Sequence, residues 1–494
     1  PGVRCRAAEG NGGSKMNAET EKVASPPGSI LGRFGALLGS QGFRMVLESV
    51  FLIILAKRSQ AVYGDFMLAF NMGAIILAVT ELGLNQHLIS RLPLSKHNPA
   101  AMLLGYTVIK CVLFLCAWTC ILVAAIGLGY SPGLTLLVMV VATGMGMEAI
   151  ASSFFSLMRY RGQQKTEGGI RALAAVAGFG YGFVMLVVRA SAAVLGFFKL
   201  LEALVNTLLS VSRAVVAIPS RDSLLTRHDI LRIFRGSVVF LLIALVSILY
   251  NKLNGIVLHR LGGAEAMAQY SSTWAIIEGI TAIVSNLMLE AVLFPVFARL
   301  HTEDRQRLSA LVQNAFRWLL LAAVPITFVA IVESDRIIGL VYGPRYAAAA
   351  MLQKPLAIAI PVGFLHNLAG YLMLGTGNEK RLLGIYAGGL LLCVLLCFSL
   401  IPAHPLAGAA VSILAVKVIV AAMTVGFCQL RFGLIDRRRV TEVLVAVLAM
   451  VSIYFLVGTW VWREVAEAAA LIPLLVLALR WRRAAQQGRG TAQP

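Results

Sequence analysis

Long apolar blocks recur along most of the chain, and this repetition limits the folds that are open to it. The blocks run from about Ile30 to Leu479 and are separated by short basic or Gly/Pro-rich stretches. A helix needs about 20 apolar residues to cross a bilayer, and each block is close to that length. We therefore predict an all-α polytopic membrane protein with about 14 transmembrane helices. The predicted spans are 32–55, 65–89, 101–126, 134–157, 168–189, 192–216, 236–258, 268–297, 311–332, 348–375, 382–402, 406–429, 441–461 and 466–480.

Composition agrees with a membrane location. Hydrophobic residues make up 59% of the 494 residues and charged residues only 13%, too few to cover a surface for water. The net charge of +20 could suggest nucleic acid, but Lys and Arg gather in the two tails and in alternate loops. That alternation is the positive-inside pattern. We expect both termini to be cytoplasmic and the basic residues to attract anionic membrane lipids, so no nucleic-acid partner is predicted.

The spacing of the spans predicts two bundles joined by a basic segment. We expect the following divisions: a disordered cytoplasmic tail at 1–29, an N-terminal six-helix bundle at 30–218, a basic cytoplasmic linker at 219–235, a C-terminal six-helix bundle at 236–430, two additional transmembrane helices at 431–482 and a cytoplasmic tail at 483–494. The seven cysteines show no disulfide or metal spacing, and no cofactor is predicted.

Several spans carry charged residues, which lipid cannot solvate. Arg44, Glu278 and Lys417 lie near the middle of their spans, where a polar cavity is a better explanation than a buried structural pair. Lys252 lies nearer a span end and could instead reach the headgroups by snorkelling. Lys199 and Glu202, three residues apart, could neutralise each other.

These residues predict a hydrated, mixed-charge lumen between the bundles. Buried ammonium and guanidinium groups suit an anionic phosphate group. The predicted substrate-binding cations are Arg44, Lys252, Lys417 and Lys199, and the predicted polar lining is Asn251, Asn254, Asn206 and Asn71.

Carboxylates at depth favour the protonated form and are candidates for coupling transport to protons or sodium. Glu278 is the first candidate, followed by Glu81 and Glu202. The alternative is that each carboxylate neutralises a nearby cation.

Several motifs resemble the polysaccharide-transport branch of the multidrug/oligosaccharidyl-lipid/polysaccharide (MOP) exporter superfamily. The stretch "IIGLVYGPRYAAAAMLQKPLAIAIPVGFLHNLAGYLMLGTGNEKRLLGIYAGG" is similar to the entry into the tenth helix and the loop that follows it. "AVYGDFMLAFNMGAIILAVTELGL" resembles the second helix of that family, and "HPLAGAAVSI" resembles the start of the twelfth.

The resemblance implies two six-helix bundles around a central cavity that opens alternately to each side, with two peripheral C-terminal helices. It implies a Wzx-like flippase that moves a polyprenyl-diphosphate-linked oligosaccharide across the bacterial plasma (inner) membrane. The cargo would be an O-antigen (lipopolysaccharide), capsule or exopolysaccharide repeat unit. A polysaccharide polymerase or glycosyltransferases of the same pathway are candidate partners.

Three other functions are alternatives to this one. The extra two helices resemble lipid II flippases, and a drug/cation antiporter shares the superfamily. An antiporter site would favour acidic and aromatic residues over buried Arg and Lys. An enzyme such as a polymerase or ligase needs a sizeable outer loop, and the predicted outer loops are short.

Overall fold

The computed structural model describes residues 27–81, 83–85, 88, 99–214, 227–285, 289 and 293–490, and contains helices but no strand within these ranges. Residues 1–26 of the predicted tail, 219–226 of the predicted linker and the last four residues lie outside the described part. The helices are α2 Pro27–Arg58, α3 Gln60–Glu81, α5 Pro99–Gly127, α6 Pro132–Tyr160, α7 Gln164–Val187, α8 Ala192–Ala214, α9 Arg227–Val284, α10 Phe294–Glu303, α11 Arg305–Val332, α12 Ser334–Val341, α13 Ala347–Leu356, α14 Ala359–Gly375, α15 Glu379–Leu400, α16 Pro405–Phe432, α17 Arg437–Gly458 and α18 Arg463–Gly490.

The prediction of an all-α polytopic fold is confirmed. Among the described residues, eleven helices are long and apolar enough to cross a membrane, or twelve when the bent pair α13 and α14 counts as one span. One of the eleven, Leu241–Val284, has 44 residues, about twice the length that a crossing needs. Its backbone leaves the helical region at Gly263 (φ 83°, ψ 177°), so α9 consists of two arms. These arms correspond to the predicted spans 236–258 and 268–297.

Two predicted spans need comment. For the span 268–297, α9 is described to Val284 and α10 from Phe294; Ser285, Leu289 and Leu293 between them are π-helical, and 286–288 and 290–292 lie outside the described residues. Pro295 at the start of α10 suits a helix N-terminus, where no intrahelical partner for its nitrogen is needed. The span 348–375 is broken into α13 and α14, which meet at an angle of 50° just after Pro355.

Polar caps mark helix ends at the boundaries of the membrane region. Asp304 accepts hydrogen bonds from the backbone N–H groups of Gln306 and Arg307 at the start of α11, and Asp436 caps α17 in the same way. Gly433 ends α16 in the left-handed conformation (φ 64°), which favours glycine. Gly433 at the end of α16 and Asp436 at the start of α17 together fix the short connection between these two helices.

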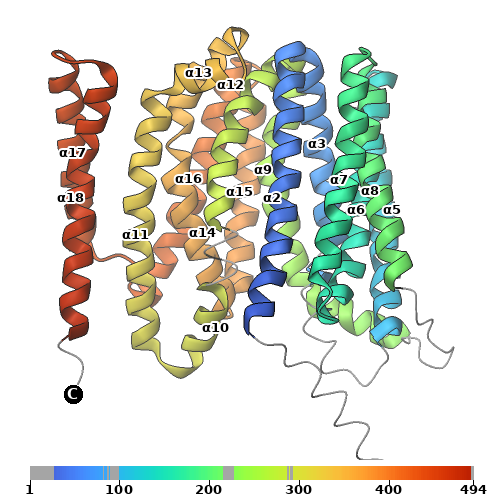
Figure 1. Ribbon diagram of the computed structural model, residues 1–494, viewed down its shortest axis with the longest axis horizontal. Helices are drawn as coiled ribbons and strands as arrows, with labels where there is room; N and C mark the ends of the chain where they lie inside the picture. The colour runs from blue at the N-terminus through green and yellow to red at the C-terminus, as the bar shows by residue number, and fades with distance from the viewer. Residues whose placement is uncertain are drawn as a thin grey trace, which may run out of the picture.

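The chain is divided into an N half (α2–α8) and a C half (α9–α16). One apolar core lies within the C half, and the core of the N half also takes in residues of α9, α12 and α13. The helices run roughly parallel to one another, with α12 and α13 at one end of the molecule and α10 at the other (Figure 1). We call these the α12 end and the α10 end. The halves meet mainly where α3 packs against α9. The two helices approach closely at Gly64, where a Cβ would lie 1.9 Å from the Ala264 carbonyl oxygen, so only glycine fits.

Helices α17 and α18 form a hairpin at the edge of the C half. In Figure 1 the hairpin stands beside α11 and away from the N half. Its apolar contacts with the rest of the molecule include Trp318, Leu321 and Phe328 of α11. At the α12 end it is also held by ion pairs from Arg463 to Glu333 (2.8 Å) and from Arg336 to Glu464 (2.8 Å).

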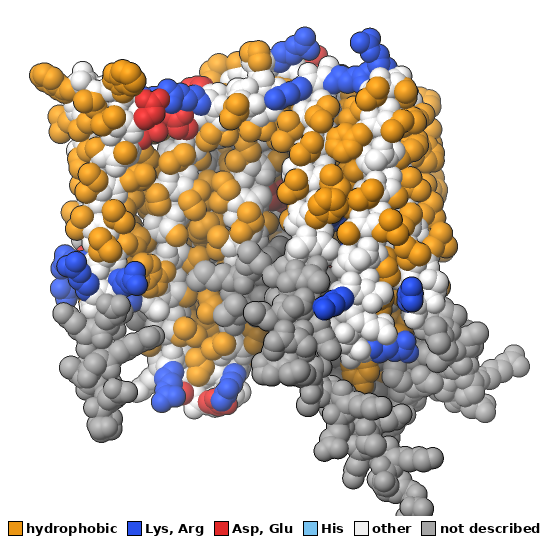
Figure 2. Space-filling model, in the orientation of Figure 1, with side chains coloured by type: hydrophobic (Ala, Val, Ile, Leu, Met, Phe, Trp, Pro, Cys, Tyr) orange, Lys and Arg blue, Asp and Glu red, His pale blue; other side chains and the backbone are white. Residues whose placement is uncertain are grey.

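The outer surface matches a bilayer. Hydrophobic side chains cover the sides of the molecule on the face that Figure 2 shows, while Lys, Arg, Asp and Glu gather at its two ends. Many large apolar side chains are exposed on these sides, among them Leu208, Leu391 and Leu448. Such a belt is stable only in lipid. The protein is therefore a multi-pass membrane protein.

Candidate functional site

Five charged side chains from three helices form one ion-pair cluster in the N half. Arg44 on α2 contacts Glu202 on α8 (Nε to Oε1, 2.6 Å) and Glu148 on α6 (3.4 Å). Lys199 on α8 donates to Glu148 (2.7 Å) and to Glu202 (3.0 Å). Glu48, one turn after Arg44, lies 3.8 Å from the guanidinium. Three carboxylates thus surround two cations.

This cluster changes the interpretation of two predicted substrate-binding cations. Lys199 and Glu202 are buried, with side chains 2% and 1% exposed, and each charge is already paired. Arg44 retains 22% exposure but shares its guanidinium among carboxylates. The structure therefore places both cations in a compensated network, which is the alternative that the Lys199–Glu202 spacing had suggested. Glu148, which sequence analysis did not select, is central to this network.

A second charged group lies in the C half, between the two arms of α9 and α16. Lys252 on the first arm has its Nζ 3.0 Å from both carboxylate oxygens of Glu278 on the second arm. Glu278 and Lys417 of α16 line a pocket of about 110 Å³ together with Asn251, whose amide donates to the Ser247 carbonyl. The predicted residues Lys252, Glu278, Lys417 and Asn251 are thus brought together.

Lys417 differs from the other deep cations in its partners. Its Nζ lies over the rings of Tyr250 (5.6 Å to the centroid) and Trp274 (5.4 Å). Within the part of the chain that the structure describes, no carboxylate lies within 4.0 Å of this ammonium. Aromatic faces stabilise a cation without neutralising it. The C-half pocket therefore has two ammonium groups nearby and one carboxylate, the opposite balance to the N half.

The polar wall of this pocket is fixed by a hydrogen-bond chain. His366 contacts the Thr424 hydroxyl through Nδ1 (3.1 Å) and the Tyr386 hydroxyl through Nε2 (3.2 Å). Both ring nitrogens are thus occupied within the protein. Across the described ranges, no group of three His, Cys, Asp or Glu side chains is arranged to hold a metal ion.

A third polar group centres on Lys110, a residue that the sequence analysis did not select. Lys110 of α5 is fully buried and donates to Asn85 Oδ1 (2.7 Å), the Ala149 carbonyl (2.6 Å) and Ser152 Oγ (2.9 Å). Glu81, a predicted coupling carboxylate, joins this group because it accepts from the Asn85 amide (3.2 Å). Lys110 is the lone charge in the apolar block 101–126, and that isolation was the available signal.

The other predicted asparagines do not share one cavity. Asn254 is fully buried and donates to the Ala409 carbonyl (2.8 Å), so it connects α9 to α16. Asn206 is 2% exposed within the N half. Asn71 packs against the backbone of α9, where a Cβ on Gly255 would lie 2.5 Å from its amide nitrogen. Helix packing therefore encloses Asn206 and Asn254, which do not line an open lumen, whereas Asn71 keeps intermediate exposure.

The family profile described as "Polysaccharide biosynthesis protein" matches residues 59–351, more than half of the chain. The chain belongs to this family. The match includes α3, both arms of α9 and the Lys252–Glu278 pair. No curated protein sequence matches the chain.

Solved structures show the fold of this polysaccharide biosynthesis protein. The lipid II flippase MurJ in an inward closed conformation is similar with a TM-score of 0.68 and 11% identity, covering 91% of this chain and 99% of MurJ. An inward-facing multidrug resistance MATE family transporter of the MOP superfamily gives a TM-score of 0.64 and 14% identity, with 80% and 94% covered. A MOP superfamily transporter from Pyrococcus furiosus, described as having a binding pocket of reversed polarity, gives 0.52 and 14%, with 82% and 94% covered. These neighbours are transporters and flippases, not enzymes, and they confirm the MOP fold.

The two halves of this polysaccharide biosynthesis protein are joined tightly at the α12 end. Tyr346 donates its hydroxyl to the Ala56 carbonyl (3.1 Å) and its ring packs near those of Tyr63 and Tyr342. Asp65 of α3 lies 2.8 Å from His259 of α9. Contacts of this kind close the molecule at one end, and they would have to separate for an opening there.

Proposed function

We propose that this protein flips a polyprenyl-diphosphate-linked oligosaccharide from the inner to the outer leaflet of the bacterial plasma membrane. The cargo would be a repeat unit of an O-antigen, capsule or exopolysaccharide. The observation that carries the proposal is Lys417, an ammonium inside the bundle with aromatic neighbours and no carboxylate within 4.0 Å among the described residues. A buried cation is costly without a counter-ion, and a diphosphate supplies one.

The Lys252–Glu278 pair supports the same assignment. Glu278 serves as the local counter-ion while the site is empty, which limits the cost of burying two ammonium groups. A diphosphate carries enough negative charge to take over this role for both lysines. Asn251, Asn367 and the tyrosines of the pocket offer the hydrogen-bonding groups that sugar hydroxyls need. Coupling to protons or sodium would then use the carboxylates, Glu278 first and the Glu148–Glu202 cluster second.

The direction of transport follows from the predicted topology. With both termini cytoplasmic, the α10 end faces the cytoplasm and the α12 end faces outward. The contacts of Tyr346 and Asp65 then close the outer side, an arrangement suited to loading substrate from the inner leaflet. A polymerase or glycosyltransferases acting on the same glycan would supply or consume the lipid-linked unit.

Complementation tests this function directly. The chain should restore surface glycan to a strain that lacks its polysaccharide flippase, and Lys417→Gln should fail to do so at equal membrane levels. The matched control is Lys354→Gln, which removes a half-exposed lysine paired to Asp335 and should complement fully. Full surface glycan with Lys417→Gln would contradict the assignment of the diphosphate site.

Two other outcomes would redirect the proposal. Rescue of cells depleted of their lipid II flippase, without rescue of surface glycan, would make the substrate lipid II. Drug resistance with neither rescue would make the protein an antiporter.

A further inference from the structure

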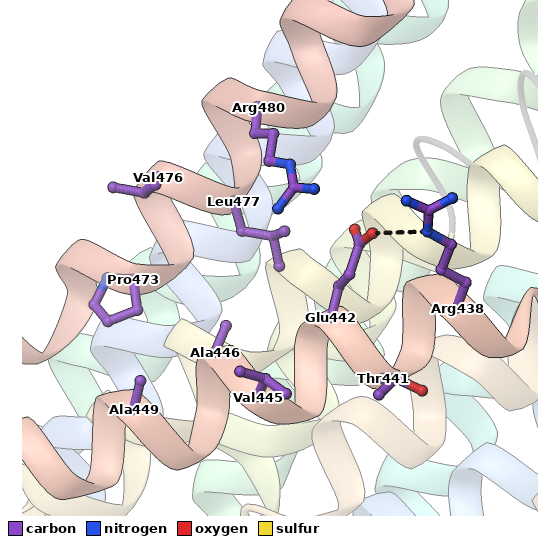
Figure 3. A pocket seen from close by; sticks show the side chains of 10 residues that line it. All are labelled: Arg438, Thr441, Glu442, Val445, Ala446, Ala449, Pro473, Val476, Leu477 and Arg480. Carbon is purple, nitrogen blue, oxygen red and sulfur yellow. Dashed lines mark ion pairs between the residues drawn. The ribbon is translucent and has the colours of Figure 1, made fainter.

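A groove of about 590 Å³ runs between α17 and α18, outside both halves of the transporter. Figure 3 shows Arg438, Glu442 and Arg480 at one end of it and Ala449 and Pro473 at the other. The complete lining is Arg438, Thr441, Glu442, Val445, Ala446, Ala449, Pro473, Val476, Leu477 and Arg480. Its volume is within the range of sites that hold a small ligand, about 300–1,000 Å³.

The middle of the groove is apolar because of the residues that the two helices present there. Ala446 and Ala449 leave little side-chain volume on α17, and Pro473 interrupts the hydrogen bonding of α18 on the facing side. Val445 and Val476 form walls that are 60% and 57% exposed. The hairpin belongs to the apolar belt that Figure 2 shows. Because the groove walls are exposed on this hairpin, we infer that the groove opens to the hydrocarbon of the membrane.

The end of the groove at the α10 end of the molecule is cationic. The Glu442 carboxylate interacts with three side chains: it accepts hydrogen bonds from Trp481 Nε1 (2.6 Å) and Arg439 (3.1 Å), and it lies 3.6 Å from Arg438. Arg480 has no ion-pair partner among the described residues. The arginines near this rim outnumber the carboxylates, Asp436 and Glu442: they are Arg437, Arg438, Arg439, Arg480, Arg482 and Arg483. An apolar channel with such a rim is complementary to a lipid with an anionic head.

The length of the groove indicates how long a lipid chain it can hold. The lining residues on α17 extend from Arg438 to Ala449, a helix length of roughly 16 Å at about 1.5 Å per residue. That is about half of the ~30 Å hydrocarbon core, the depth of one leaflet. We propose that the groove holds one acyl chain of an anionic glycerophospholipid, with its phosphate at Arg438 and Arg480. A polyprenyl chain, which is much longer than an acyl chain, would extend beyond the groove.

This lipid site is independent of the transported substrate. It lies on the hairpin, whereas the diphosphate site proposed above lies between α9 and α16. A bound phospholipid fills the space between two helices whose contact with the rest of the protein is limited to one side. We therefore expect it to stabilise the hairpin.

The test uses the purified full chain in detergent, titrated with phosphatidylglycerol, phosphatidylcholine or undecaprenyl diphosphate and followed by native mass spectrometry. We expect phosphatidylglycerol to be retained in preference to phosphatidylcholine. Removing two near-surface arginines with Arg438→Gln/Arg480→Gln should weaken retention roughly 30-fold. Ala449→Phe, which fills the groove, should abolish it.

Matched controls separate the groove from general effects of charge and bulk. Arg299→Gln/Arg307→Gln removes two exposed arginines at the same end of the molecule, and Leu448→Phe enlarges an exposed side chain outside the groove. Both should retain phosphatidylglycerol as the unmodified chain does. If Ala449→Phe does not fold, the Arg438→Gln/Arg480→Gln variant still tests the proposal. Arg438 is 81% exposed, so its substitution leaves the packing intact.

Three results would overturn the proposal. Equal retention of the two phospholipids would remove the head-group preference. Displacement of phosphatidylglycerol by undecaprenyl diphosphate, in a manner sensitive to Ala449→Phe, would assign the groove to the isoprenoid lipid. Equal losses in the control variants would show that the retained lipid is not in the groove.

Discussion

Lys252 and Glu278 pair across the break in α9, with Nζ 3.0 Å from both carboxylate oxygens. The two residues lie on opposite sides of Gly263, one on each arm of the helix. Glu278 also lines the pocket that Lys417 borders, so one carboxylate offsets two ammonium groups. The pair therefore joins the two arms and sets the charge of the C-half pocket.

Glu278→Gln should lower thermal stability, because it leaves two ammonium groups without a counter-ion. The pair is partly exposed, so we expect a loss of about 1–2 kcal/mol. Adding Lys252→Gln to the same chain should restore most of the melting temperature. Melting in detergent checks both variants, with the exposed Glu303→Gln as control. Equal melting temperatures for the single variant and the unmodified chain would show that Glu278 is not needed as a counter-ion.

Arg44→Ala should destabilise the N half. It leaves three carboxylates near a single ammonium, at an expected cost of roughly 2–3 kcal/mol. Arg44→Lys should recover only part of this loss, because an ammonium lacks the planar fork that reaches Glu148 and Glu202 together. Glu148→Gln in the Arg44→Ala chain should raise the melting temperature again by removing a repelling charge. A melting temperature that falls further in this double variant would contradict the compensated network.

Lys110→Met should destabilise the packing of α3, α5 and α6 by about 2–3 kcal/mol. The substitution keeps most of the side-chain volume but removes the donor of three hydrogen bonds. Ser152 Oγ still accepts from the Asn85 amide and the Ala149 carbonyl from Ser152 Oγ, so the loss falls mainly on Asn85 Oδ1. Thermal melting measures the effect, and Lys165→Met is the control because Lys165 is exposed. Similar melting temperatures for the two variants would mean that water can replace the ammonium.

Gly64→Val should prevent the two halves from closing at the α12 end. The added carbons would overlap the backbone of Ala264, which cannot move aside as a flexible side chain could. Ala349, fully buried at this end, should then become accessible when changed to cysteine in a chain without other cysteines. Labelling by a membrane-impermeant maleimide measures this, and Gly388→Val, which has open space around it, is the control. Equal labelling of the two would show that closure tolerates the side chain.

The order and approximate positions of the helices could be predicted from sequence because lipid imposes a length and a composition on every span. The predicted total of about 14 exceeds the eleven or twelve that qualify among the described residues, where the two arms of α9 count as one helix and α18 does not qualify. The bend between α13 and α14 could not be predicted. It depends on local packing as well as on Pro355, and hydropathy does not report packing. The tenth span therefore has the right position, but the prediction gives it as one span without the 50° bend.

The charged residues of the site could be predicted from sequence, but their ion-pair partners could not. Arg44, Lys199, Lys252, Glu278 and Lys417 all stand out as charges in apolar blocks. Which of them is compensated depends on residues from distant helices, such as Glu148 beside Lys199. Lys110 also stands out as the lone charge in its apolar block, but its partners are neutral oxygens 25 to 42 residues away in the chain, and no charge pattern reveals them.

The closure at the α12 end depends at one point on main-chain chemistry. Both Gln60 (2.7 Å) and Gln269 (2.8 Å) donate to the carbonyl oxygen of Arg345, not to its side chain. A carbonyl is present whatever amino acid occupies position 345. Substitutions at position 345 therefore keep the acceptor, whereas a substitution of Gln60 or Gln269 removes a donor. We expect natural variation at position 345, and restricted and correlated variation at positions 60 and 269.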